Sequence, residues 1–163
     1  MQEFFKTETI QERVLLIGVR TGEADDTDGS LDEMEELVKT AGALTVGRVI
    51  QNREAVHPTT YIGKGKIDEV RALAAETDAS GVVCDDELSP VQLRELEDEL
   101  QMKVMDRTLV ILDIFAGRAT TSEGKIQVEL AQLKYRLTRL TGLGRSLSRL
   151  GGGIGTRGDR KST

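Results

Sequence analysis

Four short apolar runs alternate with helical patterns along the first 106 residues, and this alternation limits the possible folds more than any other feature of the chain. The runs cover residues 14–19, 44–50, 81–84 and 103–105, and they are partly β-branched, as strands buried on both faces of a sheet are. Strands that alternate with helices are joined by right-handed crossovers, which make them parallel and place helices on the faces of the sheet. We therefore expect an α/β fold with a four-stranded, mainly parallel sheet flanked by helices.

Three helices are expected between these strands. Ser30 with Glu33, and Ser89 with Gln92, match the capping box, in which two side chains at the start of a helix each accept a backbone N–H of the other residue. The helix over residues 66–77 has no such start signal. It is predicted from the helical spacing of its apolar residues, which are Ile67, Val70, Leu73 and Ala74.

Two further helices are predicted after the last strand. Residues 108–119 are apolar nearly all round, which suits a helix wedged between the sheet domain and the C-terminal segment. Thr120 and Glu123 form a third capping-box pattern, and the longer helix that they open repeats apolar residues at intervals of four and three, namely Ile126, Leu130, Leu133, Leu137 and Leu140. Such a seam requires a partner. We expect a weak dimer with antiparallel helices, with docking of the seam on the sheet domain as the alternative.

The predicted organisation has three parts: a sheet domain over residues 1–107, a helical arm over 108–141 and a Gly/Arg-rich loop or tail over 142–163. Residues 118–163 contain ten bases and three acids, a net charge of +7. Because the whole chain carries −6, its first 117 residues carry −13. A polyanion repels the acidic part and attracts the basic end, so the chain would meet a nucleic acid with its C-terminal end.

The basic end is also rich in glycine, in the stretch GRSLSRLGGGIGTRG that begins at Gly144. A flexible basic loop of this kind can adapt to folded RNA, with backbone N–H groups on phosphates and arginines that both pair and stack. The stretch has no aromatic side chain, which disfavours recognition of single strands by stacking. A solvated tail is the alternative interpretation.

A second candidate site is the string YIGKGKIDE, at residues 61–69. Gly63 and Gly65 admit a close approach of the backbone to a phosphate, and Lys64 and Lys66 add positive charge at the start of a helix. The string lacks the spacing G-x-x-x-x-G-K-[ST] that wraps a triphosphate, and this spacing occurs nowhere in the chain. A plain glycine-rich turn is therefore the alternative.

Acidic residues follow the last two predicted strands. Asp85, Asp86 and Glu87 come after the third strand, and Asp106 with Arg107 comes after the fourth, so these side chains could meet at the carboxyl edge of the sheet. A Mg²⁺ site is conceivable there. Helix capping and a structural ion pair are preferred, because acids are favourable at the helix N-termini that begin at these points. We expect no catalytic residues and no metal ligands.

The remaining reactive side chains offer no catalytic arrangement. His57 stands beside Pro58 with no second histidine in the chain, which indicates a loop residue. The single Cys84 lies in an apolar run, which favours a buried thiol in a reducing compartment. There is no long apolar stretch and no signal-peptide pattern, so we expect a cytoplasmic protein without a membrane partner.

Several long strings resemble the N-terminal region of the HflX family of ribosome-associated GTPases. They are DDELSPVQLRELEDEL, SEGKIQVELAQL and RLGGGIGTRG, and TYIGKGKIDEV also fits, so the resemblance covers essentially the whole chain. It implies an α/β domain joined to an antiparallel helical hairpin, ahead of a GTPase domain. It also implies binding to the large ribosomal subunit and its rRNA, to split or rescue stalled ribosomes. The hairpin tip would reach towards the peptidyl-transferase centre, and the residues that match this tip are Arg145, Ser146, Arg149, Gly151, Gly152, Gly153 and Arg157.

The chain departs from the family pattern at its end, where it reads DRKST after GTRG instead of Pro-Gly-Glu and a return helix. The second arm of the hairpin and the GTP-binding motifs are expected to be missing, so the chain itself is not expected to be an enzyme or to bind a cofactor. GTP and Mg²⁺ belong to the absent GTPase domain. Two alternatives to an RNA-binding module stay open: weak nucleotide binding by Lys64, Lys66, Asp85 and Asp86, and a regulatory domain that restrains the GTPase domain.

Overall fold

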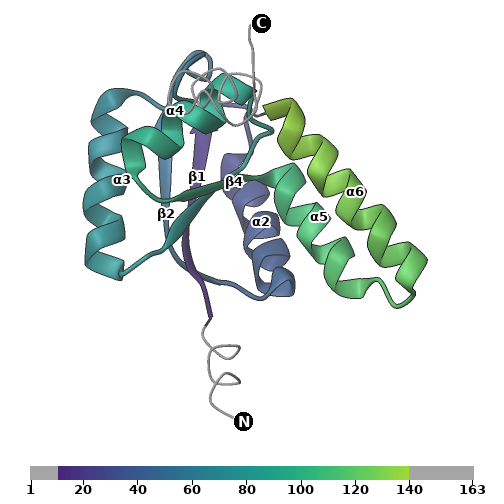
Figure 1. The fold of residues 1–163 in the computed structure, drawn as a ribbon. Helices are drawn as coiled ribbons and strands as arrows, with labels where there is room; N and C mark the ends of the chain where they lie inside the picture. The colour runs from purple at the N-terminus through teal and green to yellow at the C-terminus, as the bar shows by residue number, and fades with distance from the viewer. Residues whose placement is uncertain (1–10, 140–163) are drawn as a thin grey trace, which may run out of the picture.

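The computed structural model describes residues 11–139. Four strands form one sheet in the order β2-β1-β3-β4, and every pairing is parallel (Figure 1). The predicted α/β fold with a four-stranded sheet is therefore confirmed. Each strand begins and ends within two residues of its predicted bounds, and the strands are β1 (Arg13–Arg20), β2 (Leu44–Asn52), β3 (Gly81–Cys84) and β4 (Lys103–Asp106).

Two layers of helices cover the sheet. Helices α3 (Lys64–Thr77) and α4 (Pro90–Leu100) pack on one face, and α2 (Thr27–Ala41) and α5 (Arg107–Arg118) pack on the other. The last described helix, α6 (Ser122–Arg139), lies alongside α5 and returns towards the carboxyl edge of the sheet (Figure 1). The helix predicted over residues 66–77 is confirmed and begins two residues earlier, at Lys64.

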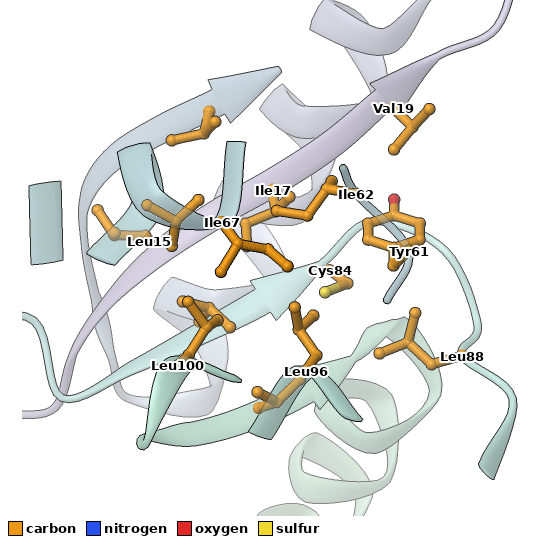
Figure 2. Close-up of a cluster of buried hydrophobic side chains, with 14 of the residues drawn as sticks. Leu15, Ile17, Val19, Tyr61, Ile62, Ile67, Cys84, Leu88, Leu96 and Leu100 are labelled. Atoms are coloured by element: carbon orange, nitrogen blue, oxygen red, sulfur yellow. The ribbon is translucent and has the colours of Figure 1, made fainter. Parts of the chain in front are cut away.

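The central strand β1 supplies side chains to both faces. Leu15 and Ile17 point into the cluster under α3 and α4, which Figure 2 shows, while Val14 and Leu16 point into the cluster under α2 and α5. All four side chains are buried, as the continuous apolar run predicts for a strand covered on both sides. Strand β1 therefore contributes side chains to both buried clusters and joins the helices on the two faces of the sheet into one folded unit.

The connections reverse direction at β1. The chain passes from β1 through α2 to β2 on one side, and then through α3 across to β3 on the other side. The loops that follow β1 and β3 therefore diverge to opposite faces at the carboxyl edge. This reversal is the position at which open α/β sheets present ligand-binding or regulatory residues.

Two of the three predicted capping boxes are wrong. Asp26, not Ser30, caps α2 and accepts the N–H of Gly29 at 3.1 Å, because an aspartate is as good a cap as a serine and stands one turn earlier. Thr121, not Thr120, caps α6 and accepts the N–H of Gly124 at 2.9 Å.

The third box is confirmed. The Ser89 side chain accepts the N–H of Gln92 at 3.1 Å, and the Gln92 side chain accepts the N–H of Ser89 at 2.9 Å. Helix α2 ends at Gly42, which takes the left-handed region with a φ of 100°.

Helix α5 is wedged as predicted, between α2 and β4 on one side and α6 on the other. The seam of α6 does not dock on the sheet domain, which was the alternative to a dimer. Its described members are half exposed, at 56% for Ile126, 50% for Leu130, 53% for Leu133 and 56% for Leu137. The opposite face of α6 packs on α5 and α4 instead, and Leu140 lies outside the described residues.

No helix within residues 11–139 combines the length and the apolar character that a membrane crossing requires.

Candidate functional site

An ion pair joins the ends of β3 and β4 at the carboxyl edge of the sheet. The Arg107 Nη2 lies 2.6 Å from Asp85 Oδ1, and its Nε donates to the Asp85 carbonyl oxygen at 3.0 Å. The same guanidinium donates to Ser30 Oγ on α2 at 2.8 Å. Burial raises the pKa of Asp85, while hydrogen bonds from Ser30 and Arg107 oppose that rise. The structural ion pair that the sequence predicts at this edge is confirmed.

Asp106 is the most buried charged residue of this edge, with no exposed surface. Its Oδ1 accepts the N–H of Leu109 at 3.0 Å and so caps α5, and its Oδ2 accepts the N–H of Leu88 at 2.9 Å. The Tyr135 hydroxyl of α6 donates to the same Oδ2. The predicted helix cap is confirmed, and the carboxylate also connects the loop before α4 with α6.

Asp86 has a role that the sequence did not reveal. Its Oδ2 accepts a hydrogen bond from the Tyr61 hydroxyl at 2.7 Å, although the two residues are 25 positions apart. Tyr61 is 1% exposed and takes a φ of 67°, a rare backbone conformation for a residue other than glycine. Burial raises the pKa of the Tyr61 hydroxyl, which stays protonated and donates to the carboxylate. No sequence spacing marks such a long-range pair.

The turn before Tyr61 is built around His57. The ring Nδ1 of His57 accepts the N–H groups of Thr59 and Thr60 at 3.1 and 3.2 Å, and its carbonyl oxygen accepts the Gln92 side chain at 2.8 Å. A short antiparallel bridge links His57 to Tyr61. His57 therefore lies in a loop, as predicted, and its contacts form the turn that precedes Tyr61.

The remaining polar and sulfur-bearing side chains near the carboxyl edge are also held by the fold. Cys84 is fully buried, and burial raises the pKa of its thiol, so the thiolate form that a nucleophile needs is disfavoured. Within residues 11–139 no group of three or more His, Cys, Asp or Glu side chains is arranged to hold a metal ion. The edge serves as a structural junction of loops and helices.

The predicted phosphate-binding residues lie at the start of α3. Gly63 is the N-cap residue, and its N–H donates to Gln51 Oε1 at 2.8 Å, while no side chain caps the helix. Lys64 is exposed beside a cavity of about 200 Å³ that His57 also lines. Lys66 is paired with Glu69 at 3.0 Å, so its charge is partly neutralised. Phosphate binding at Gly63, Lys64, Gly65 and Lys66 stays a prediction.

The four residues of the alternative nucleotide site are not brought together as free groups. Asp85 is paired with Arg107, Asp86 is bonded to Tyr61, and Lys66 is paired with Glu69. The predicted RNA-binding residues, Arg145 to Arg157, lie outside the described residues.

Two family sequence models match the chain in succession. The one described as "GTP-binding GTPase N-terminal" matches residues 28–116, and the one described as "GTP-binding GTPase Middle Region" matches residues 118–162. A curated relative named GTPase HflX, from Lacrimispora saccharolytica, is 67% identical over 158 residues, which is 97% of this chain and 37% of the relative. The chain belongs to the HflX GTPase family. It corresponds to the N-terminal part of HflX.

Other HflX proteins support the same assignment. The GTPase HflX of Caldanaerobacter subterraneus is 49% identical across 91% of this chain and 34% of its own length, and that of Escherichia coli K12 is 44% identical across 90% and 34%. The chain thus spans about a third of the length of these relatives. The resemblance carried by the sequence strings is confirmed.

Solved structures show the same fold. The complex of SsGBP with GDP has a TM-score of 0.65 at 24% identity and covers 86% of this chain and 40% of that protein. A GTP-binding protein from the archaeon Sulfolobus solfataricus, also in complex with GDP, has a TM-score of 0.63 at 24% identity and covers 83% and 40%. This HflX part therefore has the fold found in those proteins.

Proposed function

We propose that this part of HflX is a ribosome-binding module that docks its basic segment, residues 142–163, on large-subunit rRNA near the peptidyl-transferase centre. In the longer protein this docking helps to split or rescue stalled ribosomes. The observation that carries the proposal is the separation of charge along the chain: −13 over the first 117 residues and +7 over the rest. An RNA backbone attracts the second part and repels the first.

The ion pairs of the sheet domain strengthen this contrast. Arg20 is paired with Asp28, Arg48 with Asp32 and Glu35, and Arg107 with Asp85, so these bases are neutralised locally. In residues 142–163 the five bases face a single acid in the sequence. The bases that can meet phosphates are therefore concentrated after α6.

The chain itself carries out no GTP chemistry in this proposal. GTP and Mg²⁺ bind to the GTPase domain of the longer protein, which the chain precedes in a cytoplasmic enzyme. The three-part organisation at residues 1–107, 108–141 and 142–163 follows from the same reasoning. The exposed seam of α6 is then one half of a helical hairpin, and in the 163-residue chain a weak antiparallel homodimer covers it.

The alternative functions are weak phosphate binding at the start of α3 and restraint of the GTPase domain. The observation that favours the first is that no side chain caps α3 and that Lys64 is exposed there. The pairing of Lys66 with Glu69 weakens it. Thermal stabilisation of the chain by ATP would support the first alternative, and a GTPase rate altered by adding the GTPase domain in trans would support the second.

The test is a triple substitution in the basic segment: Arg145→Ala, Arg149→Ala and Arg157→Ala. The matched control is Lys39→Ala, Arg71→Ala and Lys103→Ala, which removes the same charge from exposed positions of the sheet domain. Binding to purified large subunits is measured by co-sedimentation at several salt concentrations.

The basic-segment variant should bind more weakly and lose about 0.7 to 0.9 units of salt slope for each phosphate contact removed. The control variant should keep the salt slope of the unmodified chain, and the basic-segment variant should keep its melting temperature. The control also loses the hydrogen bonds from Arg71 to the Glu99 carbonyl oxygen, so its folding is checked separately by circular dichroism. Equal affinity and equal slope for the two variants would show that the basic segment does not bind RNA.

A further inference from the structure

An ordinary amphipathic helix packs its apolar face on the protein and exposes its polar face, and α6 does the reverse. Its apolar seam faces away from the sheet domain and is half exposed, whereas polar side chains on the opposite face bond to α5 and to Asp106 at the end of β4. Gln132 Nε2 donates to Asp113 Oδ1 on α5 at 3.0 Å, and the Tyr135 hydroxyl donates to Asp106. The Tyr135 ring also packs against the buried cluster under α2 and α5, so a substitution that keeps the ring removes the hydrogen bond alone.

The acceptor of the Tyr135 hydrogen bond is held firmly. Asp106 is fully buried, and the backbone N–H groups of Leu88 and Leu109 fix both of its carboxylate oxygens. The next residue, Arg107, is fixed by Asp85 and by Ser30 of α2. A bond to this carboxylate therefore ties α6 to the rigid junction of the sheet and its helices.

Tyr135 lies far from the start of α6, so its hydrogen bond limits how far the helix can pivot around that start. The helix begins after the loop at residues 119–121. Tyr135 lies near the other end of the helix, about 20 Å from that loop along the helix axis at 1.5 Å per residue. A pivot of about 10° around the loop would move the far end of this helix, about 27 Å long, by about 5 Å. The basic segment begins just beyond that end.

We propose that Tyr135 is a positioning residue that fixes the direction in which α6 presents the basic segment to rRNA, through its hydrogen bond to Asp106. The part that concerns rRNA rests on the proposed function, while the fixed direction of α6 does not. Tyr135 need not touch RNA in this role. It keeps the basic segment aligned before the protein meets the ribosome. A larger fraction of the molecules is then in the orientation that can bind.

The experiment compares Tyr135→Phe with Tyr61→Phe in the full 163-residue chain. Both substitutions remove a phenol-to-aspartate hydrogen bond and keep the ring, but only the first bond belongs to α6. Spin labels on Glu36→Cys of α2 and Glu129→Cys of α6, both exposed positions, report the direction of α6 by pulsed electron paramagnetic resonance. Cys84 is fully buried and stays unlabelled.

The unmodified chain and Tyr61→Phe should give one narrow distance distribution, and Tyr135→Phe should give a broad one. A hydrogen bond to a charged acceptor shifts such an equilibrium by roughly tenfold or more. The affinity of Tyr135→Phe for large subunits should then fall about threefold to tenfold, in proportion to the loss of the competent orientation. The salt slope should stay unchanged, because no phosphate contact is lost.

Each outcome decides a separate part of the inference. A narrow distribution in Tyr135→Phe would overturn the fixed direction of α6 by this bond. A broad distribution with unchanged affinity would overturn the positioning role. If the unmodified chain fails to bind large subunits, the proposed function fails, and the distance measurement still decides whether Tyr135 fixes α6. A reduced salt slope in Tyr135→Phe would show that Tyr135 acts on a phosphate contact and not on direction.

Discussion

Replacing Asp106 with alanine should destabilise the protein more than any other single change at the carboxyl edge. The substitution removes the cap of α5, which costs about 1 kcal/mol. It also leaves the buried N–H of Leu88 without its acceptor, which costs about 1 to 3 kcal/mol. The hydrogen bond from the Tyr135 hydroxyl is lost as well, and this loss acts on the direction of α6. The expected decrease in the free energy of unfolding is about 3 kcal/mol.

The matched control is Asp26→Ala at the cap of α2. Asp26 is exposed and accepts one N–H, from Gly29, so its removal should cost only about 1 kcal/mol. Urea unfolding followed by circular dichroism measures both variants, with equal m-values as the condition for comparison. If Asp106→Ala costs no more than Asp26→Ala, the buried carboxylate does not connect α4, α5 and α6 in the way described.

Other expected outcomes concern association, catalysis and pH. Replacing Leu133 and Leu137 with lysine should turn a weakly dimeric chain into a monomer in sedimentation experiments, and a monomeric unmodified chain at high concentration would contradict the dimer. The purified chain should hydrolyse GTP no faster than buffer, and turnover that survives repurification would overturn this expectation. Burial raises the folded pKa of Asp85 and of Glu97 above the unfolded value near 4, so the stability that their protonation contributes is present below about pH 4 and is lost as pH rises through the folded pKa. Glu97→Gln should make the free energy of unfolding fall less steeply between about pH 3 and 7, as measured by urea unfolding at each pH. An unchanged dependence on pH would show that Glu97 does not contribute to this decrease.

The sheet could be predicted from the sequence because its pattern is local. Apolar runs such as residues 81–84 are too short for helices and are buried on both faces, so they fit a parallel strand and little else. Crossover handedness then limits how the strands connect. Helix starts were less certain, because the string DDTDGS offers several caps within one turn, and Asp26 is used while Ser30 accepts a hydrogen bond from Arg107.

Long-range polar pairs were beyond the reach of the sequence pattern. The ion pair of Asp85 and Arg107 could be anticipated, because both residues follow neighbouring strands at the same edge. The bond from Tyr61 to Asp86 could not, since it depends on the turn around His57 and on a left-handed backbone at Tyr61. The seam of α6 was visible as a pattern, but which surface it faces is decided by tertiary packing, and it faces away from the sheet domain.

The most direct test of the proposed function is the salt dependence of binding between this chain and isolated ribosomal subunits. With three or more phosphate contacts, the affinity for large subunits should fall roughly 15- to 60-fold or more between about 50 and 200 mM salt, along a log-log slope of about −2 to −3 or steeper. Binding to small subunits should be weaker at every salt concentration. A flat salt dependence, or equal affinity for the two subunits, would contradict the claim that the basic segment docks on large-subunit rRNA.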